Sequence, residues 1–61
     1  MTRAQALMLL IEAVNPITNR DLQIATGWPR RTVDGALRAL EMHGVVVRCY
    51  SGRSRVCYRP S

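Results

Sequence analysis

Residue types that carry catalytic chemistry are scarce in this 61-residue chain, which has one His and four acidic residues. The acids Glu12, Asp21, Asp34 and Glu41 fall in separate segments, and His43 has no nucleophile near it in the sequence. The sequence also lacks a glycine-rich phosphate loop. A chain of this length has one thin core and little room for an enclosed cavity. We therefore expect neither an enzyme nor a bound cofactor or small-molecule ligand.

Long apolar runs and metal-binding clusters are missing too. The longest apolar run, Ala6 to Ile11, has six residues, and a membrane-spanning helix needs about 20. A charged start followed by a longer apolar stretch, as in a signal peptide, is absent. Two Cys and one distant His make a poor zinc set. We expect a cytoplasmic protein of the bacterial, phage or plasmid type, with no membrane partner and no metal site.

Lysine is absent, so the basic charge comes entirely from nine arginines, which give a formal net charge of +5. Residues 1–29 hold two Arg and two acids (net 0), whereas residues 30–61 hold seven Arg and two acids (net +5). A one-sided basic surface attracts phosphate backbones. The chain is therefore expected to be one basic domain, residues 1–61, with a polyanionic partner.

Apolar periodicity predicts three helices, over about residues 3–14, 19–26 and 30–43. Capping boxes at Thr2 and Thr18 open the first two helices, and Gly27 and Gly44 end the second and third. The side chains expected to face the core are Leu7, Leu10, Ile11 and Val14 in the first helix, Leu22 and Ala25 in the second, and Val33, Ala36, Leu37 and Leu40 in the third.

From Val45 onward the apolar period changes from 3.6 to 2, which predicts a β-hairpin over about residues 45–59. Pairing Cys49 with Val56 gives a core face made of Val45, Val47, Cys49, Val56 and Tyr58. A slip of one residue would place Cys49 opposite Cys57 and bring Arg59 to the core face. We therefore expect the first register and two free thiols, with a Cys49–Cys57 disulfide as the alternative.

The stretch from Thr18 to Leu40, TNRDLQIATGWPRRTVDGALRAL, resembles the helix-turn-helix of winged helix-turn-helix transcription regulators. The following EMHGVVVR, residues 41–48, resembles their helix end and first wing strand. With the first helix and the hairpin, the resemblance covers nearly the whole chain. It implies a mainly α fold of three helices followed by a two-stranded wing. The sequence departs from the usual pattern of these regulators at Asp34 and Gly35, where many members carry a Ser and a long polar or basic residue.

The residues of the third helix also indicate DNA binding. When Val33, Leu37 and Leu40 face the core, a step of 100° per residue turns the polar residues of this helix outward. Arginine can bind the O6 and N7 atoms of guanine, and the amides at a helix start can bind phosphate. The resemblance implies that the wing tip contacts the DNA backbone or minor groove. The predicted DNA-binding residues are Arg30, Arg31, Thr32, Gly35, Arg38, Arg53, Ser54 and Arg55.

We thus expect a regulator of transcription that binds double-stranded DNA. The apolar residues Met8, Leu9 and Ile24 lie outside the core stripes and form a candidate homodimer surface, which would require two related half-sites in the DNA. Alternative functions are a protein-interaction module that uses this surface and a small recombination or architectural factor of a mobile element. Structured RNA is a third alternative, but the sequence offers no aromatic stacking platform for it.

Overall fold

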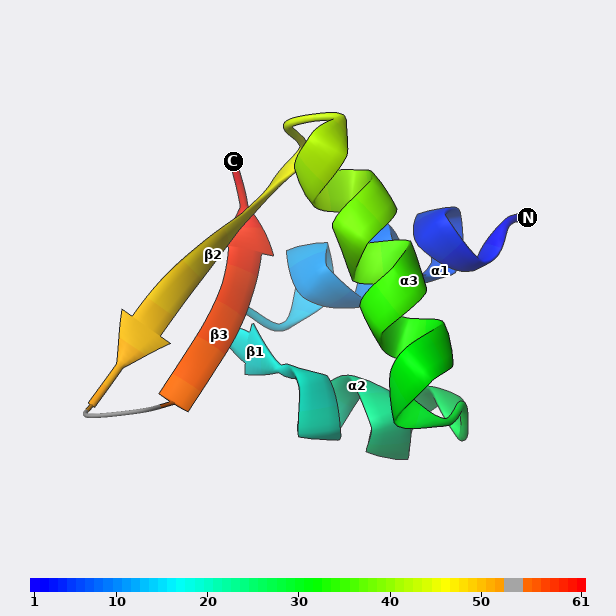
Figure 1. Cartoon of the computed structure of the whole chain (residues 1–61), viewed down its shortest axis with the longest axis horizontal. Helices are drawn as coiled ribbons and strands as arrows, with labels where there is room; N and C mark the ends of the chain where they lie inside the picture. Colours follow the sequence, from blue (N-terminus) through cyan, green and yellow to red (C-terminus); the bar gives the residue numbers. More distant parts are fainter. Residues whose placement is uncertain (53–54) are drawn as a thin grey trace.

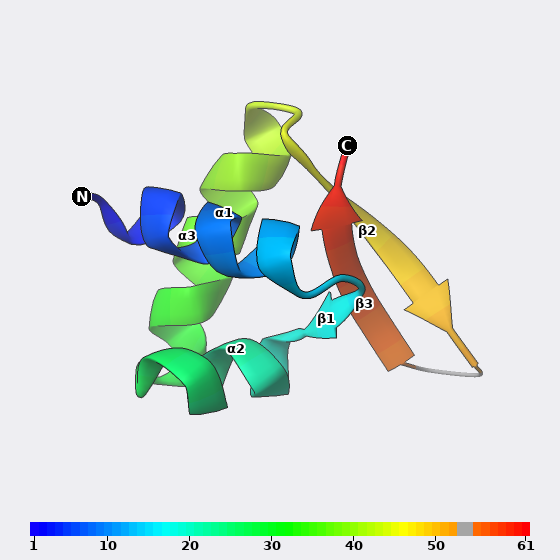
Figure 2. The same cartoon turned by 180° about the vertical axis from the view of Figure 1, so that it is seen from behind.

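The computed structural model describes residues 1–52 and 55–61. Its elements follow in the order α1 (Arg3–Ala13), β1 (Ile17–Thr18), α2 (Asn19–Thr26), α3 (Arg30–Met42), β2 (Val46–Ser51) and β3 (Arg55–Pro60). The strands form an antiparallel sheet in the order β1-β3-β2. Figure 1 shows the sheet on one side of the helices, with α3 in front of α1 and α2 below them. Figure 2 shows α1 from the opposite side, in front of α3.

Local sequence signals set the helix ends. The Thr2 hydroxyl accepts the backbone N–H of Gln5 at 3.1 Å, and the Gln5 side chain accepts the backbone N–H of Thr2 at 2.8 Å, so the predicted capping box is confirmed. The Thr18 hydroxyl accepts the backbone N–H of Asp21 at 3.1 Å. Gly27 ends α2 in the left-handed conformation, with φ of 75°. The predicted bounds of all three helices are confirmed to within one residue.

The core lies where α1, α3 and the inner face of the sheet meet above α2. It consists of Leu7, Ile11, Ile17, Leu22, Val33, Leu37, Leu40, Val46 and Tyr58. The prediction that Val14 and Ala25 belong to the core is wrong, because both residues are exposed. Val14 is the C-cap of α1 and has extended backbone, so its side chain leaves the helical stripe. On α2 the half-buried residue after Ala25 is Thr26, whose hydroxyl donates to the Leu22 carbonyl at 2.7 Å.

The sheet has a third strand that the periodicity did not predict. Ile17 pairs with Tyr58 and Thr18 with Cys57, which puts β3 in the middle of the sheet. Ile17 is 5% exposed and belongs to the core. A strand of two residues is too short to show an alternating pattern, so its partner on β3 identifies it. The prediction of two strands is therefore corrected to three strands within residues 1–52 and 55–61.

The register of the hairpin formed by β2 and β3 differs from the predicted one. Cys49 lies opposite Cys57 rather than Val56, and both cysteines are free thiols. The inward residue at the start of β2 is Val46, which is 2% exposed, whereas the predicted Val45 is 40% exposed. Several adjacent valines satisfy either alternation equally well, so the sequence pattern cannot tell which of them points inward.

The observed register does not bury an arginine. Arg59 lies opposite Val47 on the face of the sheet turned away from the helices, and it is exposed. Arg48 shares the inward face with Val46, but the hairpin extends past the helices toward its turn (Figure 1), so this position remains partly in solvent. The prediction was wrong because it placed Val45 and Val47 on the core face, whereas Val46 is the valine of β2 that points inward.

Among the described residues, no helix has both the length and the apolar character needed to cross a membrane.

Candidate nucleic-acid interface

The outward face of α3 carries arginines. Val33 and Leu37 are fully or almost fully buried and fix the inward side of the helix. Arg31, Gly35 and Arg38 lie on the opposite side and are exposed. Because α1 lies behind α3 in Figure 1, the side of α3 away from α1 is the side seen in that view. The structure therefore places these three predicted residues together on one open helix face.

Thr32 lies on the flank of α3 that is turned toward α1. It is half-buried and lines a shallow hollow together with Arg31, Gly35, Ala36 and the first residues of the chain, Thr2, Arg3 and Ala4. Arg3 is the first residue of α1 and was not among the predicted DNA-binding residues. The structure thus adds one further arginine beside the predicted face of α3.

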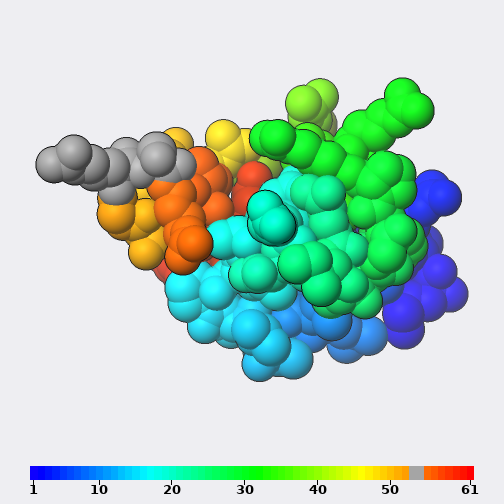
Figure 3. Space-filling model, turned by 90° about the horizontal axis from the view of Figure 1, so that it is seen from below, coloured from blue at the N-terminus to red at the C-terminus, as the bar shows by residue number. Residues whose placement is uncertain are grey.

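A larger cleft of about 690 Å³ lies between α2, α3 and the hairpin. Among the described residues, four arginines line it: Arg20 of α2, Arg30 of α3, Arg48 of β2 and Arg55 of β3. Figure 3 shows this side of the molecule, with α2 in the middle, the hairpin on one side and α3 on the other. Two of the four, Arg30 and Arg55, were predicted to bind DNA. Arg20 and Arg48 were not predicted, because only the fold brings segments this far apart in sequence to one cleft.

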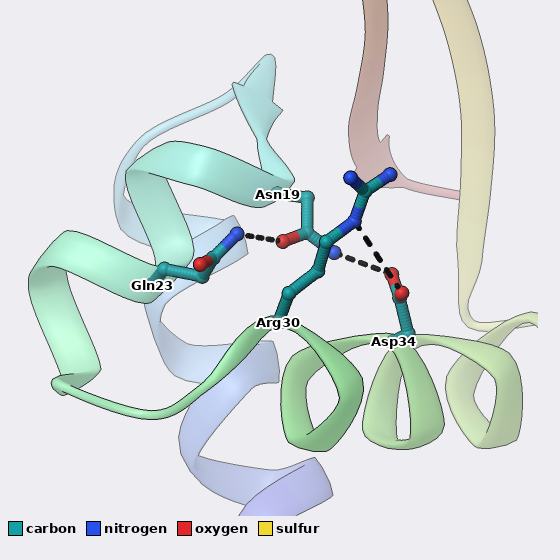
Figure 4. A network of polar contacts seen from close by, with 4 residues as sticks. All are labelled: Asn19, Gln23, Arg30 and Asp34. Carbon is teal, nitrogen blue, oxygen red and sulfur yellow. Dashed lines mark hydrogen bonds and ion pairs between the residues drawn. The ribbon is translucent and has the colours of Figure 1, made fainter.

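A network of polar side chains joins α2 to α3 at the edge of this cleft (Figure 4). The Gln23 amide donates to the Asn19 side-chain oxygen at 2.6 Å, and the Asn19 amide donates to Asp34 Oδ1 at 2.5 Å. The other carboxylate oxygen, Asp34 Oδ2, lies 3.7 Å from Arg30 Nε, one helical turn away. Asp34 is therefore the centre of a contact between the two helices.

Arg48, which lines the cleft, forms an ion pair with Glu41. Its Nε lies 3.3 Å from Glu41 Oε1, and its Nη2 donates to Oε2 at 3.4 Å. The guanidinium carbon lies 6.0 Å from the centre of the Tyr58 ring, within the range of a cation–π contact. Glu41 raises the pKa of Arg48 above its ordinary value, chiefly through the hydrogen bond. Burial is the main cause that raises the pKa of Tyr58.

The electrostatic character of the site follows from these pairs. The carboxylates of Asp34 and Glu41 partly compensate the charges of Arg30 and Arg48. Exposed arginines of α2, of the outward face of α3 and of the start of β3 are then available to an external anion, and they are Arg20, Arg31, Arg38 and Arg55. They come from three different elements, α2, α3 and β3, rather than from one small pocket. The predicted residues Arg53 and Ser54 lie outside the described residues.

The candidate dimer residues are divided between two places. Leu9 is 54% exposed and lines a hollow on α1 with Met8, which is half-buried and packs against the core. Ile24 is 72% exposed and lines a different hollow, beside Gly27 and Trp28. Among the described residues, Leu9 and Ile24 therefore line two different hollows.

Within residues 1–52 and 55–61, no group of three His, Cys, Asp or Glu side chains is placed to share a metal ion. A comparison of the chain with protein-family models, with curated proteins and with solved structures finds no match.

Proposed function

We propose that this protein binds double-stranded DNA as a winged helix-turn-helix regulator of transcription. In this proposal α2 and α3 are the helix-turn-helix and the hairpin is the wing. The observation that carries the proposal is the placement of an arginine-bearing helix face beside an arginine-lined cleft and a projecting hairpin. The proposal assigns the protein a binding role and no catalytic step.

The dimensions of α3 and of the molecule fit this role. A helix of 13 residues is about 20 Å long, and a major groove about 12 Å wide admits an α-helix. The longest extent of the domain is 33 Å, which is close to one turn of B-DNA, about 34 Å. One copy would therefore cover about one helical turn, and a dimer would need two half-sites.

The exposed arginines set the expected salt dependence. If Arg20, Arg31, Arg38 and Arg55 each neutralise one phosphate, log Kobs should fall with log salt concentration with a slope of about −3.6. Contacts from Arg3 would make the slope steeper by about 0.9. A partner held mainly by apolar contacts would give a much smaller slope, so this measurement separates the two kinds of binding.

The test is a selection of bound sequences from random duplexes of 20–30 base pairs at two salt concentrations. A common sequence that is enriched, with a steep salt slope, supports the proposal. Arg31→Ala should reduce both affinity and enrichment. Arg59→Ala is the matched control, because Arg59 is also exposed but lies on the outer face of the sheet. Equal effects of the two variants, or absence of binding at low salt, would refute the proposal.

A second candidate function is a protein-interaction module, and the exposure of Leu9 and Ile24 favours it. Both side chains are large, apolar and outside the core. The same two residues are candidates for a homodimer surface. Sedimentation of the protein with and without DNA, together with Leu9→Ser and Ile24→Ser variants, distinguishes these states. A dimer that either substitution dissociates would assign the surface to self-association.

A further inference from the structure

The polar network in Figure 4 has a feature that the proposed function does not explain. A carboxylate sits among the arginines of the cleft, where it lowers the attraction for phosphate. Asp34 is nevertheless held firmly, because its Oδ1 accepts from Asn19 and Asn19 in turn accepts from Gln23. A solvated carboxylate on a helix surface would not need partners from a second helix. Phosphate binding therefore does not account for the position of Asp34.

Asp34 is placed to orient Arg30. Asp34 Oδ2 lies 3.7 Å from Arg30 Nε, which is the nitrogen on the inner side of the guanidinium. The two terminal nitrogens of Arg30 point away from the carboxylate (Figure 4). The Arg30 side chain is 78% exposed, whereas that of Asp34 is 44% exposed. The carboxylate therefore engages the inner edge of the guanidinium and leaves its outer donors open.

Those outer donors match one base. The terminal nitrogens of arginine can donate two parallel hydrogen bonds to guanine O6 and N7 in the major groove. Arg30 is the first residue of α3, and in DNA-binding helices of this kind the N-terminal residues reach the base edges. An arginine that is already oriented loses less conformational freedom on binding than a free one.

We propose that Arg30 reads a guanine and that Asp34, fixed by Asn19 and Gln23 of α2, is the positioning residue that orients it. This inference rests on the proposed function, because it assigns one base contact within the DNA interface. An exposed ion pair between residues four apart on a helix is weak by itself. The additional bond from Asn19 on α2 is what fixes the carboxylate in one place.

A substitution at Asp34 should change the preference for guanine and the affinity for random DNA in opposite directions. Asp34→Asn keeps the shape of the side chain but removes its charge. Affinity for random DNA should rise, because a negative charge leaves the interface. Preference for guanine at one position of the selected site should fall about tenfold, since a bidentate arginine–guanine contact gives about this discrimination. Arg30→Lys keeps the positive charge but lacks the rigid planar fork of the guanidinium, so it should weaken the same preference.

Glu41→Gln is the matched control. Glu41 lies on the same helix, pairs with another arginine of the cleft, and its substitution changes the net charge by the same amount. It should raise affinity for random DNA and leave the guanine preference unchanged. Asn19→Ala leaves Asp34 and Arg30 in place but removes the bond from α2, so it should weaken the preference as well. Thermal unfolding of each variant verifies that the domain is folded.

The outcomes are distinguishable. If Asp34→Asn and Glu41→Gln both keep the guanine preference, Asp34 is not a positioning residue, while the proposed DNA binding stands. If Arg30→Lys keeps it, Arg30 does not read guanine. If the unaltered protein selects no common sequence, the proposed function is wrong, and this inference is wrong with it. A preference that falls in Asp34→Asn and Arg30→Lys but not in Glu41→Gln supports the inference.

Discussion

Replacing Gly35 by alanine is expected to stabilise the fold and to weaken DNA binding at the same time. Gly35 lies inside α3 at an exposed position, and a methyl group built there meets no atom within 4 Å. Glycine in a helix interior costs roughly 0.5–1 kcal/mol relative to alanine. The free energy of unfolding should rise by about this amount. In a domain this small, the rise corresponds to a Tm increase of roughly 2–8 °C.

Urea unfolding followed by circular dichroism measures this change, and Gly27→Ala provides the control. A methyl group at Gly27 also meets no atom within 4 Å, but the backbone there has a φ of 75°. A side chain in this left-handed conformation costs roughly 1–2 kcal/mol, so Gly27→Ala should lower the free energy of unfolding. A domain of this length has a total stability of about 3–9 kcal/mol, so both changes are large enough to measure.

The binding measurement tests whether the outward face of α3 enters the groove. If the backbone at Gly35 lies against DNA, the added methyl group overpacks that contact, which costs roughly 1–3 kcal/mol and lowers affinity at least about fivefold. The gain in stability excludes unfolding as the cause of such a loss. A Gly35→Ala variant that binds like the unaltered protein would show that this face does not approach DNA. A destabilised variant would contradict the open helical environment of Gly35.

Three further predictions follow from the same structure. Arg20→Ala should weaken binding to all sequences similarly and make the log–log salt slope shallower by about 1, as measured by fluorescence anisotropy at several salt concentrations; an unchanged slope would place Arg20 outside the interface. Leu37→Ala removes a side chain that is 1% exposed and should lower the free energy of unfolding by about 2–5 kcal/mol in urea titrations; a loss below about 1 kcal/mol would contradict its place in the core. Burial raises the pKa of Tyr58 in the folded state above the ordinary value of 10.0, so its contribution to stability is complete below pH 10 and is lost as the pH rises through the raised pKa. Tyr58→Phe should remove that alkaline loss in unfolding experiments between pH 8 and 11, and an identical loss in the variant would assign it to another group.

The helices could be predicted from the sequence because the signals that bound them are local. Thr2 and Thr18 cap α1 and α2 through contacts three residues away, and Gly27 ends α2 through its own backbone conformation. The apolar stripe of α3 likewise identified the residues that are buried, and therefore the exposed face on which Arg31 and Arg38 lie. Each of these features depends on residues within about one helical turn of one another, so the sequence alone determined them.

The sheet and the cleft were decided by tertiary structure. The strand β1 exists because Ile17 and Thr18 meet β3, some 40 residues later in the chain. The inward valine of β2 is selected by where the helices cover the hairpin, which no local alternation shows. The cleft that joins Arg20 to Arg48, and the contact that ties Asn19 to Asp34, form when α2, α3 and the hairpin pack around one core. Because these contacts join residues far apart in sequence, only the packed core determines them.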